Sequence, residues 1–137
     1  MGYNIKDMLE VSEDGFSAVR SDGFYIFYNP DKLETRLNFT LAHELGHLSL
    51  SHHKLLNSKI LAHGGSSIIE RQANIFAHNI LMPVERTIDY LDIKTIVELA
   101  EIFNVSPAMV STRLKYISYD RKCLNIVRIR GNLHEIY

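Results

Sequence analysis

The chain has 137 residues, 46% of them hydrophobic, so it is long and apolar enough for one packed domain. Its 15 basic and 16 acidic residues give a formal net charge of -1, which excludes a strong long-range attraction to nucleic acid or anionic lipid. The single cysteine, Cys123, excludes an internal disulfide, and no secretory signal or membrane-spanning apolar run is recognisable. We therefore expect a cytoplasmic protein that makes no use of a membrane.

Two short segments, 16–20 and 24–29, are rich in aromatic and β-branched residues and predict strands. Between them stand Ser21, Asp22 and Gly23, and Asp-Gly is a strong hairpin signal. The pattern therefore predicts a β-hairpin near the N-terminus. Its edge could pair with an extended substrate, although a hairpin that only covers the core fits the pattern equally well.

Apolar residues then recur at helical spacing over 33–51, which predicts a helix. Gly46 lowers the helix propensity of this segment, so we expect its small size to serve packing or a close backbone approach. Residues 52–66 are polar and predict a loop. A second helix is expected over 68–81, where Pro83 disfavours its continuation.

The rest of the chain continues with mainly helical patterns. A short helix is expected over 84–91, followed by helices over 94–103 and 107–116, whereas 124–130 alternates and predicts a late strand. We interpret the whole as a single α+β domain. Its parts are a core over 1–91, a helical pair over 92–117, and a C-terminal strand and tail over 118–137.

Residues 43–47 read HELGH, an HExxH motif inside the first predicted helix. Positions four apart in a helix lie about 40° apart around its axis and one turn along it, so His43 and His47 can reach one ion. Glu44 lies beside the first of them, where it can take a proton from a water activated by that ion. A shuffled chain of this composition would contain the motif roughly 0.02 times. We therefore favour a metal site over a helix that merely shows two histidines on its polar face.

A catalytic zinc usually has three protein ligands and a water. We prefer Glu70 as the third, because the connection between the two helices is long enough to bring the second back antiparallel to the first. Asn74 follows one helical turn later and could hydrogen-bond a ligand or a substrate carbonyl. Other histidines remain alternatives, and the two directly after the motif would need a sharp reversal of the chain. These alternatives are His52, His53, His63 and His78.

Together these motifs resemble those of the ImmA/IrrE metallopeptidases. Residues 40–47 read TLAHELGH, 70–77 read ERQANIFA and 80–83 read ILMP, so two separate motifs occur in the family's order. The resemblance implies a compact, zincin-like and more specifically gluzincin-like core with a sheet and helices. It also implies cleavage of a transcriptional repressor or a related antitoxin-like regulator, often encoded nearby on a phage or another mobile element. The zinc ligands that it implies are His43, His47 and Glu70.

Other groups are expected to act on the substrate of such a metalloendopeptidase. Glu44 would pass the proton of the attacking water to the leaving amine. The oxyanion then needs a donor, and His78, a tyrosine or an arginine could supply it. The family often carries a basic residue at the position of Asn38, so Arg36 is the nearby candidate for a positive charge at the site.

Residues 97–114 also have the pattern of a helix-turn-helix, whose second helix would enter the major groove of DNA. This predicts an alternative function, a DNA-binding or regulator-binding module with a structural zinc. We favour packing on the peptidase core instead, because Glu98 and Glu101 make the first helix acidic. The DNA interpretation exposes Ser111, Thr112, Arg113 and Lys115, whereas the packing interpretation buries Leu99, Phe103, Val110 and Leu114.

Overall fold

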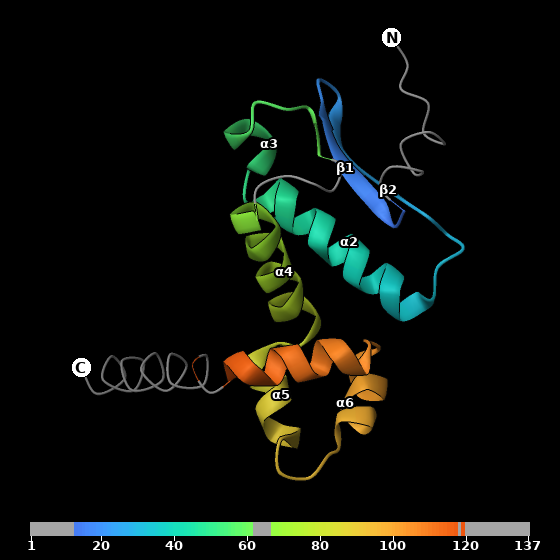
Figure 1. The fold of residues 1–137 in the computed structure, drawn as a ribbon, viewed down its shortest axis with the longest axis vertical. Coiled ribbons are helices and arrows are strands. Elements are labelled where there is room, and N and C mark those ends of the chain that lie inside the picture. The colour runs from blue at the N-terminus through green and yellow to red at the C-terminus, as the bar shows by residue number, and fades with distance from the viewer. Residues whose placement is uncertain (1–12, 62–66, 118, 120–137) are drawn as a thin grey trace, which may run out of the picture. The chain divides into compact units, whose positions relative to one another are not determined.

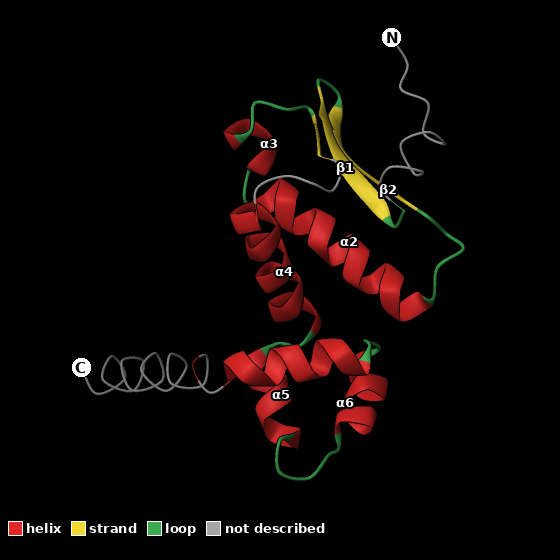
Figure 2. Cartoon of the chain, viewed as in Figure 1, coloured by secondary structure: helices red, strands yellow, loops and turns green. Residues whose placement is uncertain are grey.

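A computed structural model describes residues 13–61, 67–117 and 119 of the chain. It has the predicted α+β class and divides into two compact units, Met1–Leu81 and Met82–Tyr137. The first unit contains β1 (Gly15–Arg20), β2 (Gly23–Tyr28), α2 (Glu34–Ser49), α3 (His52–Leu55), β3 (Ile60–Leu61) and α4 (Ser67–Leu81). The second contains α5 (Val84–Thr87), the 3₁₀ helix η1 (Ile88–Tyr90), α6 (Ile96–Phe103) and a further helix over 107–117 (Figures 1 and 2).

The predicted hairpin is present and forms most of a small antiparallel sheet. The strand order is β2-β1-β3, so β1 is central and β2 lies at an edge. The register of β1 and β2 leaves Ser21 and Asp22 as a two-residue turn. Gly23 follows the turn with a φ of +152°, a backbone conformation that L side chains rarely adopt. The glycine predicted in the turn is therefore needed at its exit.

The helix α2 is the central element of the first unit, because it packs on both long strands and on α4 (Figure 1). On the sheet side, Phe16 of β1 is buried and stacks on Phe27 of β2, with the ring centroids 4.8 Å apart. Gly15 begins β1 because a Cβ atom there would lie 2.5 Å from the carbonyl oxygen of Phe27. The sheet thus sits directly on the helix that carries the HExxH motif.

On its other side, α2 approaches α4 closely at Gly46. A Cβ atom at this position would lie 3.1 Å from Cβ of Phe76 and 3.2 Å from Cα of Ala73. Ala73 is itself fully buried. The helix therefore has glycine in its interior at a point where α4 leaves little room: a Cβ atom would already press on its neighbours by a few tenths of an ångström, and a larger side chain would push the two helices apart.

We expect Gly46→Leu to lower the free energy of unfolding by about 1–3 kcal/mol, because overpacking a filled contact forces backbone shifts. Gly46→Ala is the matched control: it gains about 1 kcal/mol in helix propensity, and its neighbours need to give way only slightly. Chemical denaturation of both metal-free variants measures the difference. A leucine variant as stable as the alanine variant would show that the approach of the two helices is not tight at this point.

The predicted loop over 52–66 is wrong for much of its described part. Ser51 takes a left-handed conformation, with φ 57° and ψ 35°, and turns the chain back immediately after α2. The short helix α3 then buries His52 and His53, and the two-residue strand β3 pairs with β1. The polar composition suggested a loop, but two of the polar residues, the histidines, are buried in the first unit. Residues 62–66 and the predicted strand over 124–130 lie outside the described residues.

In the second unit, α6 begins at a capping box. The Thr95 hydroxyl accepts from the backbone N–H of Glu98, and the Glu98 carboxylate accepts from the N–H of Thr95. Asn104 ends the helix with a left-handed φ of 52°. Leu99 on α6 and Val110 on the helix over 107–117 are both buried. The apolar pattern of the predicted helical pair is thus used for packing.

Arg113 belongs to this packed interior and is only 1% exposed. Its Nε donates a hydrogen bond of 3.0 Å to the carbonyl oxygen of Met82, at the start of the same unit. The DNA interpretation needs this side chain on the surface, where it is not found. Ser111 and Lys115 are exposed, so the outer face of this helix presents these two residues without the arginine.

We expect Arg113→Met to lower the free energy of unfolding by about 1–3 kcal/mol, since the Met82 carbonyl would be left without this donor. Lys115→Met, on the exposed face of the same helix, should change it by no more than about 0.5 kcal/mol. Thermal and urea denaturation of the two variants measure the contrast. Equal stabilities would mean that the buried guanidinium does not hold the second unit together.

Candidate metal centre

The helix α2 presents His43 and His47 one turn apart on its buried side. The rings are 4% and 2% exposed, and their Nε2 atoms are 3.0 Å apart. Glu44 is 1% exposed, and one of its carboxylate oxygens lies within 4.8 Å of a ring nitrogen of each histidine. The spacing of the motif therefore places two imidazoles and a carboxylate in one buried cluster.

Glu70, in the first turn of α4, reaches the same point from the neighbouring helix. Its Oε2 lies 3.1 Å from Nε2 of His43, and its Oε1 lies 3.4 Å from Nε2 of His47. The close contact of α2 and α4 at Gly46 makes this reach possible. The preferred third ligand of the sequence analysis thus meets the two motif histidines.

The separations of these donor atoms fit one zinc ion. Zinc binds imidazole nitrogen and carboxylate oxygen at about 2.0–2.1 Å in tetrahedral geometry, which puts neighbouring donors about 3.3 Å apart. Here the two imidazole nitrogens are 3.0 Å apart, one oxygen of the Glu70 carboxylate lies 3.1 Å from the first, and the other oxygen lies 3.4 Å from the second. Two imidazoles and one carboxylate are also a common donor set of catalytic zinc, with one position left for water.

Asn74 holds the ring of His43 from the far side. Its side-chain Oδ1 lies 2.8 Å from Nδ1 of His43. An amide oxygen can only accept, so Nδ1 carries the proton and Nε2 of the neutral ring keeps its lone pair for an ion. The predicted position of Asn74, one turn after Glu70, supplies this contact.

His52 holds the ring of His47 in the same manner, and the sequence analysis did not identify this role. Its Nδ1 lies 2.8 Å from Nδ1 of His47, and its Nε2 lies 3.0 Å from Oε1 of Gln72. The sharp reversal that argued against His52 as a ligand is the turn at Ser51. Its neighbour His53 is also buried, and desolvation lowers the pKa of that ring below its usual value.

A family model described as the IrrE N-terminal-like domain, of the M78 peptidases, matches residues 4–115. The chain belongs to this family. It is therefore a metallopeptidase in the general sense, with a protein substrate, and the ImmA/IrrE resemblance seen in the motifs is confirmed. Comparisons with curated proteins and with solved structures gave no match. Within the described segments, every helix is too short or too polar to span a lipid bilayer.

A pocket of about 220 Å³ opens beside the donor cluster of this M78 peptidase. His43 and Glu70 of the donor cluster both line it. Its walls come from the segment before β1 and from the two helices that carry the cluster. The lining residues are Asp14, Phe39, Thr40, His43, Glu70 and Asn74.

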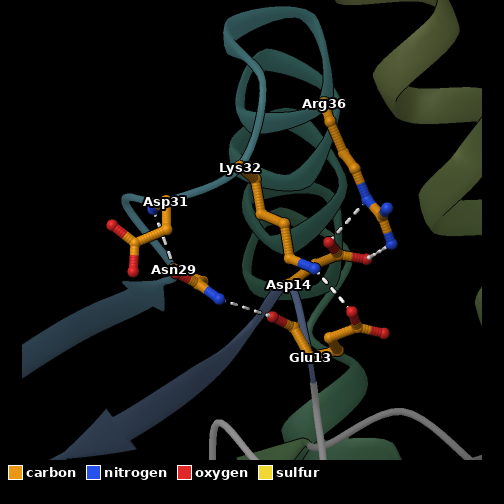
Figure 3. A network of polar contacts seen from close by, with 6 residues as sticks. All are labelled: Glu13, Asp14, Asn29, Asp31, Lys32 and Arg36. Carbon is orange, nitrogen blue, oxygen red and sulfur yellow. Dashed lines mark hydrogen bonds and ion pairs between the residues drawn. The ribbon is translucent and has the colours of Figure 1, made fainter.

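Arg36 reaches this pocket through a partner. Its Nε lies 2.6 Å from Oδ1 of Asp14 and its Nη2 donates to Oδ2 at 2.9 Å (Figure 3). This bond to Asp14 raises the pKa of Arg36 above its usual value. Beside it, the ammonium of Lys32 lowers the pKa of Glu13. The predicted positive charge therefore fixes an acidic side chain of the pocket wall.

His78 lies two turns beyond Glu70 on α4 and is 8% exposed. Its ring centroid is 5.9 Å from that of Phe39, which stands at the same distance from the ring of His43. Phe39 is thus in ring contact with both histidines. His63, another alternative ligand, lies outside the described residues.

Proposed function

We propose that the protein is a zinc-dependent endopeptidase that cleaves a transcriptional repressor or a related antitoxin-like regulator. The single observation that carries the proposal is the convergence of Nε2 of His43, Nε2 of His47 and the carboxylate of Glu70. These separations suit zinc. Membership of the M78 peptidase family indicates that a metal held here would serve peptide hydrolysis. Because such a regulator acts in the cytoplasm, the proposal places the enzyme there too. Its gene would lie beside that of the regulator, on a phage or another mobile element.

In this proposal Glu44 is the general base. A zinc ion held by the three ligands would supply an acidified water and polarise the scissile carbonyl. Glu44 takes the proton of the attacking water and delivers it to the leaving amine. Its buried position beside both histidines supports this role, since the carboxylate stays within reach of the reacting atoms.

An extended substrate has a sheet edge to pair with. The strand β2 lies at the outside of the order β2-β1-β3, and the helix that carries the motif packs on it. Main-chain hydrogen bonds along such an edge hold a peptide irrespective of its sequence. The pocket that His43 and Glu70 line would then receive one side chain, beside Asp14, which Arg36 holds in the pocket wall.

Metal removal tests the proposal directly. Wild-type protein is incubated with the regulator encoded beside its gene, before and after dialysis against a chelator, and fragments are identified by mass spectrometry. We expect cleavage to stop on chelation and to return with one equivalent of zinc. Cleavage that continues at the full rate in the chelated protein would exclude metal-dependent hydrolysis.

The alternative, a DNA-binding or regulator-binding module with a structural zinc, gives the opposite pattern in the same samples. It requires a gel shift with DNA or a stable complex with the intact regulator, and no fragments. The burial of Arg113 and the acidic side chains Glu98 and Glu101 on α6 weigh against the DNA form of this alternative.

A further inference from the structure

A buried histidine that follows the HExxH helix is placed against the metal cluster by a special turn. The backbone N–H of Leu50 bonds to the carbonyl of Gly46 and closes α2, and Ser51 then reverses the chain in the left-handed region. The reversal costs backbone strain, because a non-glycine residue rarely adopts this conformation. It leaves His52 with no exposed surface and sets its ring against that of His47, 5.0 Å away between centroids.

The hydrogen bonds of His52 have only one consistent direction when the rings are neutral. Oε1 of Gln72 can only accept, so Nε2 of His52 donates to it over 3.0 Å. Nδ1 of His52 then carries a lone pair and accepts from Nδ1 of His47 over 2.8 Å. The proton of His47 is thereby held on Nδ1, and its Nε2 keeps a lone pair directed at Nε2 of His43 and at Glu70.

We propose that His52, itself oriented by Gln72, is a positioning residue that fixes the tautomer and orientation of His47 for metal binding. The proposal rests on the metal site of the proposed function and not on its peptidase activity. Partners that accept the second N–H of a ligating histidine raise its basicity, and their loss typically lowers metal affinity about 10–100-fold. The ring of His43 donates directly to the amide of Asn74. The ring of His47 donates to His52, which in turn donates to Gln72.

A structural role for His52 would also make its replacement harmful, since the ring is fully buried. Gln72 separates the two explanations, because it is exposed on α4 and its side-chain oxygen meets His52. Gln72→Leu removes the acceptor at the end of the series. Gln72→Glu keeps an acceptor and strengthens it with a charge. Asn79→Leu, an exposed amide two turns further along α4, is the matched control.

The experiment measures the zinc dissociation constant by competition with a chromophoric chelator, together with the visible absorption of the cobalt-substituted protein. We expect Gln72→Leu to bind zinc measurably more weakly than wild type, by less than the about 10–100-fold that loss of a direct acceptor costs, and to alter the cobalt spectrum. Gln72→Glu should bind at least as tightly as wild type, and Asn79→Leu should match it. His52→Asn, whose amide oxygen can replace Nδ1 as acceptor, should bind more tightly than His52→Leu.

Each result bears on one idea. Equal zinc affinities and cobalt spectra in wild type, Gln72→Leu and Gln72→Glu would overturn the positioning role, even if His52→Leu fails to fold. A wild-type protein that binds no zinc would instead overturn the proposed function, because the site itself would be absent. Thermal melting of the metal-free variants shows that a changed affinity is not a changed fold.

Discussion

Glu44→Gln is expected to bind zinc as the wild type does and to cleave the regulator at least about 100-fold more slowly. Glutamine has nearly the same size as glutamate, so the buried position beside His43 and His47 remains filled. It cannot take a proton from water at neutral pH, so the step assigned to Glu44 has no acceptor. The loss should fall on kcat, because the side chain acts on the reacting atoms and not on the distant parts of the substrate.

The assay compares initial rates of fragment formation at equal, measured zinc content. Glu34→Gln is the control, because it makes the same chemical change in the first turn of the same helix, on an exposed side chain. It should cleave at the wild-type rate. A Glu44→Gln protein with full zinc and full activity would remove Glu44 from the mechanism and move the search for a base to another carboxylate.

The local part of the site could be predicted because it depends on helix geometry alone. Two residues four positions apart on one helix lie on one face in any fold, so His43 and His47 needed no knowledge of the rest of the chain. Glu70 required one further step, the return of a second helix. That step succeeded because Gly46 and Ala73 let the helices approach until a glutamate side chain spans the gap.

The parts that could not be predicted depend on single backbone or burial choices. His52 enters the site only because Ser51 accepts a left-handed conformation, and nothing in the composition of 52–66 signals that choice. Polarity misled in the same way at Arg113, which bonds a carbonyl inside the second unit. The available signal was the pair of adjacent histidines directly after the motif helix.

Glu70→Ala is expected to weaken zinc binding by more than about 100-fold, because loss of a partner one step further out already costs about 10–100-fold. The variant keeps two imidazoles but loses the only anion among the three proposed ligands. The zinc affinity of Glu70→Asp should lie between those of the wild type and Glu70→Ala. Its shorter side chain draws the carboxylate away from the histidine nitrogens, which the glutamate approaches to 3.1 and 3.4 Å. Chelator competition measures the affinities, and the cobalt spectrum reports the ligand set.

His78→Ala, on the same helix, separates the two roles that the sequence leaves open for this histidine. If His78 is the third ligand in place of Glu70, the His78→Ala variant loses zinc and the Glu70→Ala variant keeps it. If His78 is instead the oxyanion donor, the His78→Ala variant keeps zinc and its kcat falls about 100–1,000-fold. Geometry favours Glu70 for the metal, because its oxygens already lie at ligand separation from both motif histidines, whereas the ring of His78 packs on Phe39 with the centroids 5.9 Å apart. Zinc retained by Glu70→Ala and lost by His78→Ala would reverse that assignment.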